Sequence, residues 1–266
     1  MQMKRLYVVG TGPGAEAMIT PEVEHAIAAS SDLVAYGLYL DLLGARIDGK
    51  TRHDRPLGEE IERARLALEL AASGRTTALI SSGDIGIFAM ATLVFELLER
   101  KQHGEEEGHG WEHVEIEVMP GISAMQLAAA RMGAALGHDF CAISLSDLLT
   151  PWETIETRIR AAALGDFVVS FYNPVSKKRD WQLARARELL LERRPAQTPV
   201  ILGRNLGRDN ETVRLTTLGE LRVEDVDMLT LVQVGSSATR VFNDGRRNWV
   251  YTPRGYARKL TLGDAS

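Results

Sequence analysis

The feature that most limits the possible folds is an apolar segment that runs into a glycine-rich turn, Leu6-Tyr-Val-Val-Gly-Thr-Gly-Pro-Gly14. Four consecutive apolar residues, two of them β-branched, are typical of a strand buried on both faces of a parallel sheet. Open α/β sheets bind ligands at the carboxyl ends of their strands, and glycines there let the backbone approach a ligand closely. We therefore expect an α/β fold with a binding site at this turn.

The turn differs from the nucleotide-binding motifs that it superficially resembles. Its sequence is Gly-Thr-Gly-Pro-Gly, and Pro13 lacks the amide N–H that a phosphate cradle would use. The next helix is expected only several residues later, with Thr20 as N-cap and Pro21 at the first helical position. A Rossmann or P-loop phosphate site is therefore not expected. Taken alone, the turn is equally compatible with a strand end that binds nothing.

Composition narrows the class of protein. The 266 residues are 45% hydrophobic and 25% charged, which suits one large or two modest globular domains. No apolar run reaches membrane-spanning length, and the first residues lack the pattern of a signal peptide, so a cytoplasmic protein without a membrane partner is expected. The formal net charge of −5 argues against a nucleic-acid partner.

The residue types that ligate metals give no recognisable site. His103, His109 and His113 lie in a glycine- and glutamate-rich stretch without a known ligand spacing, and we interpret that stretch as a solvated loop. Cys141 is the single cysteine and lies in an apolar segment, so we expect a buried, inert thiol. No metal is expected.

Strands and helices alternate through the first half of the chain. A strand over 77–81 is followed by a turn containing Gly83 and Asp84 and then by a helix, which repeats the pattern of the first strand. Parallel strands end at the same edge of a sheet, so this second turn should lie close to Gly12-Pro13-Gly14. Further strands over 32–35 and 114–119 and helices over 20–30 and 57–73 complete the predicted elements of this half.

The second half alternates in the same way, but some of its strands follow one another too closely for helical crossovers, which predicts a mixed sheet. We place one domain over residues 1–119, a second over 120–243 and a C-terminal tail over 244–266. The predicted strands of the second domain lie near 140–144, 167–171, 199–203, 213–216 and 229–234, and its helices over 123–132, from 151 and over 181–192.

Five segments have a recognisable pattern when they are taken together: Val9–Gly14, Ser82–Phe88, Pro120–Ala124, Phe171–Pro174 and Leu202–Asn205. They resemble the tetrapyrrole methylases, which are S-adenosylmethionine-dependent enzymes of corrinoid and sirohaem synthesis. The similarity extends from about residue 5 to residue 240 with order and spacing preserved. It implies two α/β domains, a parallel-sheet N-terminal one and a mixed-sheet C-terminal one, with the cofactor cleft between them, and a homodimer.

Within that family, four further segments look like the C17-methyltransferases of cobalamin (corrin) biosynthesis. The resemblance implies methylation of precorrin-3B at C17 with ring contraction to precorrin-4. The alternatives are the cobalt-factor III or cobalt-precorrin-3 C17-methyltransferase of the anaerobic branch, a methylase of the same fold that acts on RNA or protein, and a non-enzymatic carrier of corrinoid intermediates. The segments are Ser144–Trp152, Tyr172–Arg179, Gly235–Arg240 and Tyr251–Tyr256.

The resemblance also assigns a cofactor site for S-adenosylmethionine and its product S-adenosylhomocysteine. Methyl transfer from a sulfonium requires an aligned donor and acceptor, which suits a crevice lined by backbone. Asp84 is expected to contact the cofactor or orient the acceptor, and the alternative is a cap for the following helix. The implied cofactor residues are Gly12, Pro13, Ser82, Gly83, Asp84, Ile87, Ser123, Ala124, Asn173, Arg204 and Asn205.

The acceptor implied by the resemblance is a macrocycle with many carboxylates, for which cationic side chains are the natural partners. Candidates are Lys177, Lys178, Arg179, Arg240 and Arg254, although the Lys-Lys-Arg run is also typical of a solvated helix start. Ring contraction needs proton transfers, and for these groups we favour Asp147, then Tyr172. Asp147 is alternatively a turn or cap residue. With Asp84, these two complete the predicted catalytic residues.

Overall fold

The computed structural model describes residues 4–176 and 179–256. The chain divides into two compact units, Met1–Ser123 and Ala124–Ser266, and each is described by itself. The sequence analysis placed the boundary after residue 119 and counted residues 244–266 as a tail. In the structure the division follows Ser123, and part of that tail forms a strand.

Unit 1 contains a five-stranded sheet in which all paired strands are parallel, in the order β3-β2-β4-β1-β5. Strand β4 lies at the centre of this order. Strand β1, the apolar segment from which the sequence analysis began, lies between β4 and β5, and its residues Leu6 to Val9 are all buried. The strands are β1 (Arg5–Gly10), β2 (Asp32–Ala35), β3 (Thr51–Asp54), β4 (Thr77–Ser81) and β5 (Glu115–Met119).

Helices cover both faces of this sheet. Side chains alternate along β1, so Leu6 and Val8 pack with helices α3 and α4, whereas Tyr7 and Val9 pack with α1 on the opposite face. Thr20 caps α1 by accepting a hydrogen bond from the Val23 N–H, as predicted. The helices are α1 (Pro21–Ala29), α2 (Gly37–Asp41), α3 (Glu60–Ala72) and α4 (Ala91–Gln102), with short 3-10 turns at Glu16–Met18, Gly44–Ile47 and Trp111–His113.

Unit 2 contains a mixed sheet in the order β10-β9-β11-β8-β7. Strands β7 and β8 are parallel, and β11 runs antiparallel to both β8 and β9. The carboxyl ends of β7, β8 and β9 therefore share one edge of the sheet. The predictions of a parallel N-terminal and a mixed C-terminal sheet are confirmed. The strands are β7 (Phe140–Ser144), β8 (Val168–Tyr172), β9 (Pro199–Arg204), β10 (Thr212–Thr217) and β11 (Thr230–Val234).

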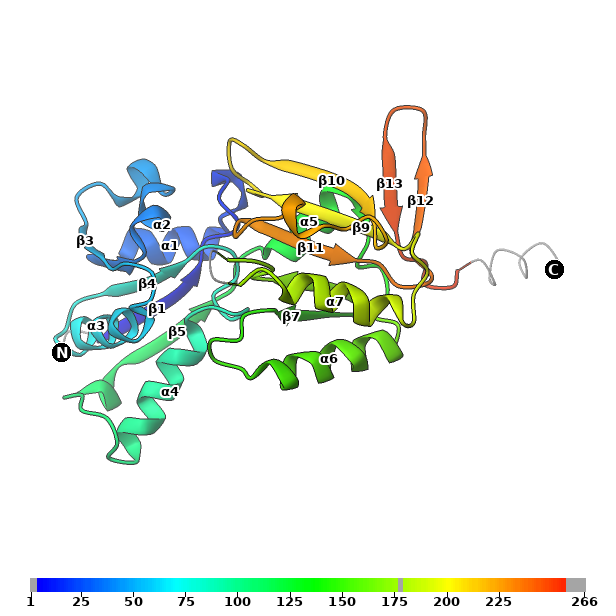
Figure 1. Cartoon of the computed structure of the whole chain (residues 1–266). Helices are drawn as coiled ribbons and strands as arrows, with labels where there is room; N and C mark the ends of the chain where they lie inside the picture. Colours follow the sequence, from blue (N-terminus) through cyan, green and yellow to red (C-terminus); the bar gives the residue numbers. More distant parts are fainter. Residues whose placement is uncertain (1–3, 177–178, 257–266) are drawn as a thin grey trace, which may run out of the picture. The chain divides into compact units, whose positions relative to one another are not determined.

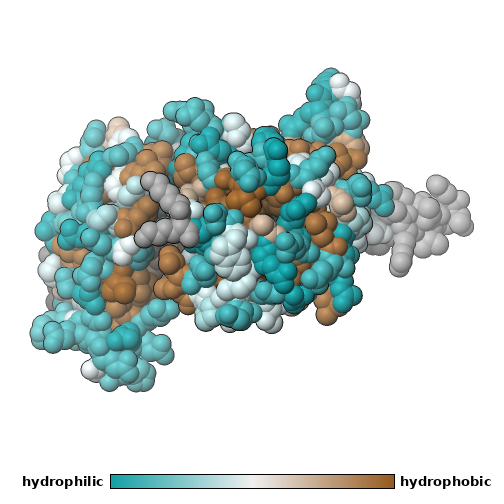
Figure 2. Space-filling model, in the orientation of Figure 1, coloured by the Kyte–Doolittle hydropathy of each residue, from teal (hydrophilic) through white to brown (hydrophobic). Residues whose placement is uncertain are grey.

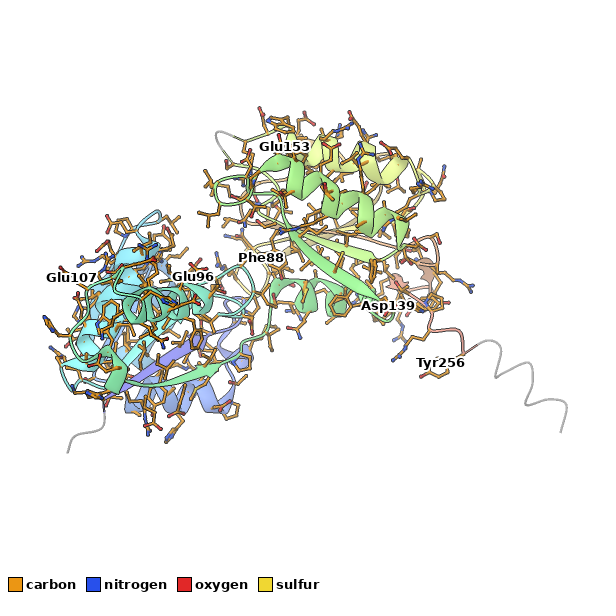
Figure 3. The ribbon with its side chains drawn as sticks, turned by 90° about the horizontal axis from the view of Figure 1, so that it is seen from below. Phe88, Glu96, Glu107, Asp139, Glu153 and Tyr256 are labelled. Atoms are coloured by element: carbon orange, nitrogen blue, oxygen red, sulfur yellow. The ribbon has the colours of Figure 1, made fainter. Side chains whose placement is uncertain are left out.

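The core of unit 2 lies between this sheet and two helices, α6 and α7, which Figure 1 shows side by side along one face of the sheet. Ile155 and Ile159 of α6 and Leu183 of α7 are buried against Phe171 and Val232. Figure 3 shows Asp139, just before β7, and Glu153, in the first turn of α6, at opposite ends of the unit. The helices are α5 (Ala124–Met132), α6 (Trp152–Leu164) and α7 (Gln182–Leu191), with a 3-10 turn at Val223–Asp225.

A second, three-stranded sheet belongs to unit 2, in the order β12-β13-β6. Strands β12 (Arg240–Asn243) and β13 (Asn248–Tyr251) form a hairpin, and β13 pairs with the short β6 (Gly133–Ala134). The hairpin projects from the unit in Figure 1, and its tip is hydrophilic in Figure 2. Because β13 falls within the predicted tail, that stretch includes an ordered part of the second unit.

Candidate active site

The two glycine-containing turns of unit 1 meet at the carboxyl edge of its sheet. Gly12 and Gly83 form an isolated antiparallel bridge, with N–H to carbonyl distances of 3.1 and 2.6 Å. The Thr11 N–H donates to the Ser81 carbonyl, and Ser82 Oγ donates to the Gly12 carbonyl. The predicted proximity of these turns is therefore confirmed, and the adjacent parallel strands β1 and β4 explain it.

A third loop, which follows β5, packs against the same place. A Cβ atom at Gly121 would lie 2.2 Å from the Gly83 carbonyl oxygen and 2.4 Å from that of Gly10. A Cβ atom at Gly10 would likewise lie 2.8 Å from the backbone nitrogen of Ile85. Only glycine fits at both positions, since real Cβ atoms do not approach backbone so closely. The edge is thus built from backbone packed on backbone.

Gly83 differs from its neighbours because it is open on one side. Its φ of +73° favours glycine, yet a Cβ built there would meet nothing within 4 Å. The backbone of this turn is therefore accessible to a ligand at van der Waals distance. Pro13, Ser82 and Ile87, which the sequence analysis also assigned to a cofactor, lie in the same two turns.

Asp84 ties two of the loops together. Its Oδ1 accepts a hydrogen bond from the Gly86 N–H at 2.8 Å, and its Oδ2 accepts one from the Gly121 N–H at 3.1 Å. The alternative of a helix cap is wrong, because α4 begins only at Ala91 and has Met90 at its N-cap without a side-chain hydrogen bond. Asp84 therefore shapes the loops, and each carboxylate oxygen keeps capacity for a further donor.

In unit 2, two asparagines directly follow strands that run in the same direction on either side of β11. Asn173 follows β8 and Asn205 follows β9, with φ values of +51° and +49°. Asparagine tolerates this left-handed conformation better than most residues, which explains its use at both positions. Asn173 Nδ2 also donates to Ser144 Oγ at the end of β7, at 3.1 Å. The resemblance had assigned both asparagines to the cofactor.

Tyr172 is the last residue of β8, and its hydroxyl oxygen accepts a hydrogen bond from the Met125 N–H at 3.2 Å. That N–H belongs to the first turn of α5, where backbone donors lack partners within the helix. The predicted residues Ser123 and Ala124 immediately precede it. Tyr172 thus holds the start of α5 at the carboxyl edge of β8.

The loop after β7 is fixed by residues from the start of the α7 region. Arg179 is buried and donates to Ser146 Oγ at 3.2 Å and to the Asn173 carbonyl at 2.9 Å. Gln182, which is also buried, donates from Nε2 to Asp147 Oδ2 at 3.0 Å. Predicted residues Asp147, Asn173 and Arg179 are therefore brought together at this edge.

Arg204 is the last residue of β9 and donates to the Asp227 carboxylate. Burial raises the pKa of Asp227, but hydrogen bonds from Thr230, Arg204 and the Leu229 N–H outweigh it and leave the pKa below its ordinary value. The Asn205 N–H donates to the Leu229 carbonyl. These contacts attach the β9 end to the start of β11.

Arg240 and Arg254 lie elsewhere. Ser237 donates from its backbone N–H and its hydroxyl to Asp166, just before β8, so residues 235–239 lie at the edge opposite Asn173. Arg240 opens the hairpin at that edge, and Thr252, bonded to Thr239, returns the chain to it before Arg254. The structure therefore does not bring these two arginines together with the other candidates.

A family model described as Tetrapyrrole (Corrin/Porphyrin) Methylases matches residues 5–222 of the chain. The chain belongs to the tetrapyrrole methylase family. It is accordingly a methyltransferase, as the sequence analysis predicted.

Three similar proteins place this methylase more closely. A precorrin-3B C(17)-methyltransferase of Sinorhizobium sp is 48% identical over 253 residues, which are 95% of this chain and 97% of the relative. A probable cobalt-factor III C(17)-methyltransferase of Salmonella typhimurium is 47% identical over 94% of this chain and 99% of the relative. The crystal structure of the methyltransferase CobJ is 43% identical, has a TM-score of 0.84 and covers 93% of this chain and 99% of that one.

The remaining predictions on this methylase have different outcomes. Lys177 and Lys178 lie outside the described residues. Cys141 is partly buried against the core of unit 2, and that burial raises the pKa of its thiol. Over residues 4–176 and 179–256, none of the helices combines the length and the apolar character that crossing a membrane requires.

Sequence reasoning missed several residues that shape the site. The Pro120-Gly-Ile-Ser-Ala segment was part of the resemblance, but the steric demand on Gly121 became visible only in three dimensions. Gln182 was missed because a glutamine in the first turn of an amphipathic helix is ordinarily solvated. The spacing of three residues between Arg179 and Gln182 gave no indication that the Gln182 amide donates to Asp147.

Proposed function

We propose that this protein transfers a methyl group from S-adenosylmethionine to C17 of precorrin-3B, with ring contraction to precorrin-4, in cobalamin biosynthesis. The similarity to the precorrin-3B C(17)-methyltransferase of Sinorhizobium sp carries this proposal, because it extends over nearly the whole length of both chains. The backbone-built turns of unit 1 support it, since they offer a surface rather than a set of reactive side chains. Methyl transfer needs positioning more than it needs acid–base chemistry.

The methyl donor is proposed to bind the turns after β1 and β4. The open side of Gly83 suits a ligand that approaches the backbone, and Pro13 removes a donor that a phosphate group would want. Gly12, Pro13, Ser82, Gly83 and Ile87 would hold it, with Asp84 fixing the loops around it. When bound, S-adenosylmethionine supplies the methyl group on its sulfonium, and S-adenosylhomocysteine is the product.

Unit 2 is proposed to complete cofactor and acceptor binding. Asn173, Arg204 and Asn205 stand at the carboxyl ends of β8 and β9, and their backbone there is held in fixed conformations. Ser123 and Ala124 are proposed cofactor contacts at the start of α5. Asp147 and Tyr172 are proposed as the proton-transfer groups of ring contraction.

The carboxylates of the macrocycle are proposed to bind cations of unit 2. Lys177 and Lys178 are candidates, as the resemblance implies. The Arg179 guanidinium points instead to Ser146 and Asn173, which suits a role in holding the loop. Arg240 and Arg254 lie at the opposite edge, so they are the weaker candidates for the same macrocycle.

A cobalt-containing substrate is the second candidate. The probable cobalt-factor III enzyme of Salmonella typhimurium is 47% identical, against 48% for the precorrin-3B enzyme, so similarity does not choose between them. A methylase acting on RNA or protein is a third candidate. The net charge of −5 argues against an RNA substrate. We further propose that the protein is a cytoplasmic homodimer, to be tested by light scattering.

The test is incubation with methyl-labelled S-adenosylmethionine and either precorrin-3B or its cobalt-loaded counterpart, followed by mass spectrometry. Label on the metal-free macrocycle is the expected result. Label on the cobalt form alone would support the second candidate function, a methyltransferase with a cobalt-containing substrate. Label on neither, but on added structured RNA or protein, overturns the proposal.

A further inference from the structure

A buried amide next to the loop after β7 has no role in the function proposed so far. Gln182 is the first residue of α7 and its side chain is only 2% exposed. Its Nε2 donates to Asp147 Oδ2, whereas its Oε1 has no hydrogen-bond partner among the described residues. Burying an amide with one unpaired acceptor costs stability, so the bond to Asp147 is an expensive arrangement for fold alone.

The loop that carries Asp147, the partner of this amide, is held by hydrogen bonds at two successive residues. Arg179 fixes Ser146, and Gln182 fixes Asp147. Ser144 Oγ accepts from the Ser146 N–H and from Asn173 Nδ2, which closes the network onto the end of β8. The Asp147 carboxylate is therefore set by the protein and does not sample the rotamers of an ordinary surface aspartate.

Asp147 is nevertheless exposed to solvent. Among the residues that the structure describes, its Oδ1 has no hydrogen-bond partner. The next two residues, Leu148 and Leu149, are 83% and 98% exposed, which is unusual for two adjacent leucines in a fixed loop. The Oδ1 atom of Asp147 thus lies next to two exposed leucine side chains. This combination suits a ligand that has an apolar ring face and polar hydrogens.

We propose that Gln182 is a positioning residue, which fixes Oδ2 of Asp147 so that Oδ1 faces the tetrapyrrole and accepts a proton from it during ring contraction. In that step an O–H or N–H bond of the substrate breaks, its electron pair stays on the substrate, and the proton forms a bond with Oδ1. Exposure of Asp147 lets the proton pass on to solvent. Leu148 and Leu149 contact the apolar ring face. This inference rests on the proposed function.

The experiment compares Gln182→Glu, which keeps size but removes the N–H donor, with Gln182→Met, Asp147→Asn and the double variant Asp147→Asn/Gln182→Glu. Gln197→Glu and Asp180→Asn are the matched controls, because both residues are exposed and make no side-chain hydrogen bond among the described residues. Label from S-adenosylmethionine reports methyl transfer, and the carbon NMR signal of the extruded acetyl group reports contraction. S-adenosylhomocysteine affinity and melting temperature are measured for each variant.

We expect Gln182→Glu and Gln182→Met to lower kcat for contraction about tenfold, with KM within about twofold. Asp147→Asn should lower it about a hundredfold or more. The double variant should be no slower than Asp147→Asn alone, because Gln182 acts through Asp147. S-adenosylhomocysteine affinity and methyl transfer should persist in all of them.

Unchanged contraction in both Gln182 variants would overturn the inference, and so would a double variant in which the two losses multiply. A lower melting temperature together with weaker S-adenosylhomocysteine binding in the Gln182 variants would also count against the inference, because it would indicate a structural role. Absence of methyl transfer by the wild-type protein would instead contradict the proposed function, so the two failures are distinguishable.

Discussion

The carboxyl edges of the two sheets are built in opposite ways. In unit 1 the edge is backbone packed on backbone at Gly10, Gly83 and Gly121, with a single carboxylate joining the loops. In unit 2 the corresponding edge is a network of side chains, in which Asn173 and Arg179 hold the loop after β7. The first kind of edge tolerates no added side-chain atom at Gly10 or Gly121, whereas the second depends on its side-chain hydrogen bonds.

The largest expected effect follows from adding one atom to the glycine edge. Gly121→Ala would place Cβ within 2.4 Å of two carbonyl oxygens, so the loops after β1, β4 and β5 must separate. We expect a loss of unfolding free energy of about 3 kcal/mol and of S-adenosylhomocysteine binding. Urea unfolding and calorimetry measure both.

The control for that variant is Gly49→Ala, where φ is +75° and a Cβ meets nothing within 4 Å. It should cost only about 1 kcal/mol, from the left-handed backbone, and leave ligand binding intact. Equal losses in the two variants would contradict the steric account of this edge.

The second effect comes from the carboxylate of unit 1. Asp84→Asn keeps size but replaces one acceptor by an NH2 group, which then faces the N–H of Gly86 or Gly121. We expect about 2 kcal/mol of destabilisation, together with weaker S-adenosylhomocysteine binding. Asp48→Asn, an exposed aspartate in the same unit without a side-chain hydrogen bond in the described structure, should change neither. If Asp84→Asn left the unfolding free energy unchanged, the N–H groups of Gly86 and Gly121 would have to find other partners.

The third effect tests the side-chain edge of unit 2. Asn173→Ala removes both the hydrogen bond to Ser144 and the residue type suited to φ +51°, with an expected cost of about 1.5 kcal/mol. Asn173→Gly keeps the backbone conformation and should recover part of that loss. Thermal unfolding separates the two contributions, and a glycine variant less stable than the alanine variant would contradict the backbone argument.

The smallest effect concerns acid stability at the same edge. The lowered pKa of Asp227 means that its stabilisation is present above the ordinary value of 3.8 and is lost as pH falls through the lowered one. Asp227→Asn should therefore be less stable than wild type at pH 7, by under about 1 kcal/mol because the pair with Arg204 is partly exposed. The difference should narrow as the pH falls from 7 through the lowered pKa of Asp227.

Urea unfolding over a series of pH values from 7 downward measures this difference. Asp209→Asn is the matched control, since Asp209 is exposed in the same region and has no side-chain hydrogen bond in the described structure. A gap between Asp227→Asn and wild type that stayed constant as the pH was lowered below 3.8 would contradict the assignment to this carboxylate.

Much of the fold could be predicted because local rules and the tertiary structure agree. The apolar run of β1, the Thr20 cap and the strand–turn–helix repeats each specify an element without reference to distant residues. Strand β3 and the β12–β13 hairpin were not predicted, because β3 has no apolar run and the apolar runs of β12 and β13 are only two or three residues long. Their pairing depends on neighbours far along the chain.

The site was predictable to the extent that strand order determines it. Gly12 and Gly83 meet because β1 and β4 are adjacent and parallel, and Asn173 and Asn205 share an edge because β8 and β9 run the same way. Charge alone did not locate Arg179, Arg240 and Arg254, since the direction of an arginine depends on partners that the sequence does not place side by side. Whether the cofactor lies between the two units stays a prediction.

The β12–β13 hairpin has a practical consequence. Its turn around Gly245 stands at the end of unit 2 remote from Asn173 and Asp147, and Asp244 organises it locally through the N–H groups of Arg246 and Arg247. A fluorophore or an affinity tag attached there would report on or immobilise the enzyme without crowding the residues proposed for the site. The hairpin turn is thus a suitable labelling site for single-turnover spectroscopy.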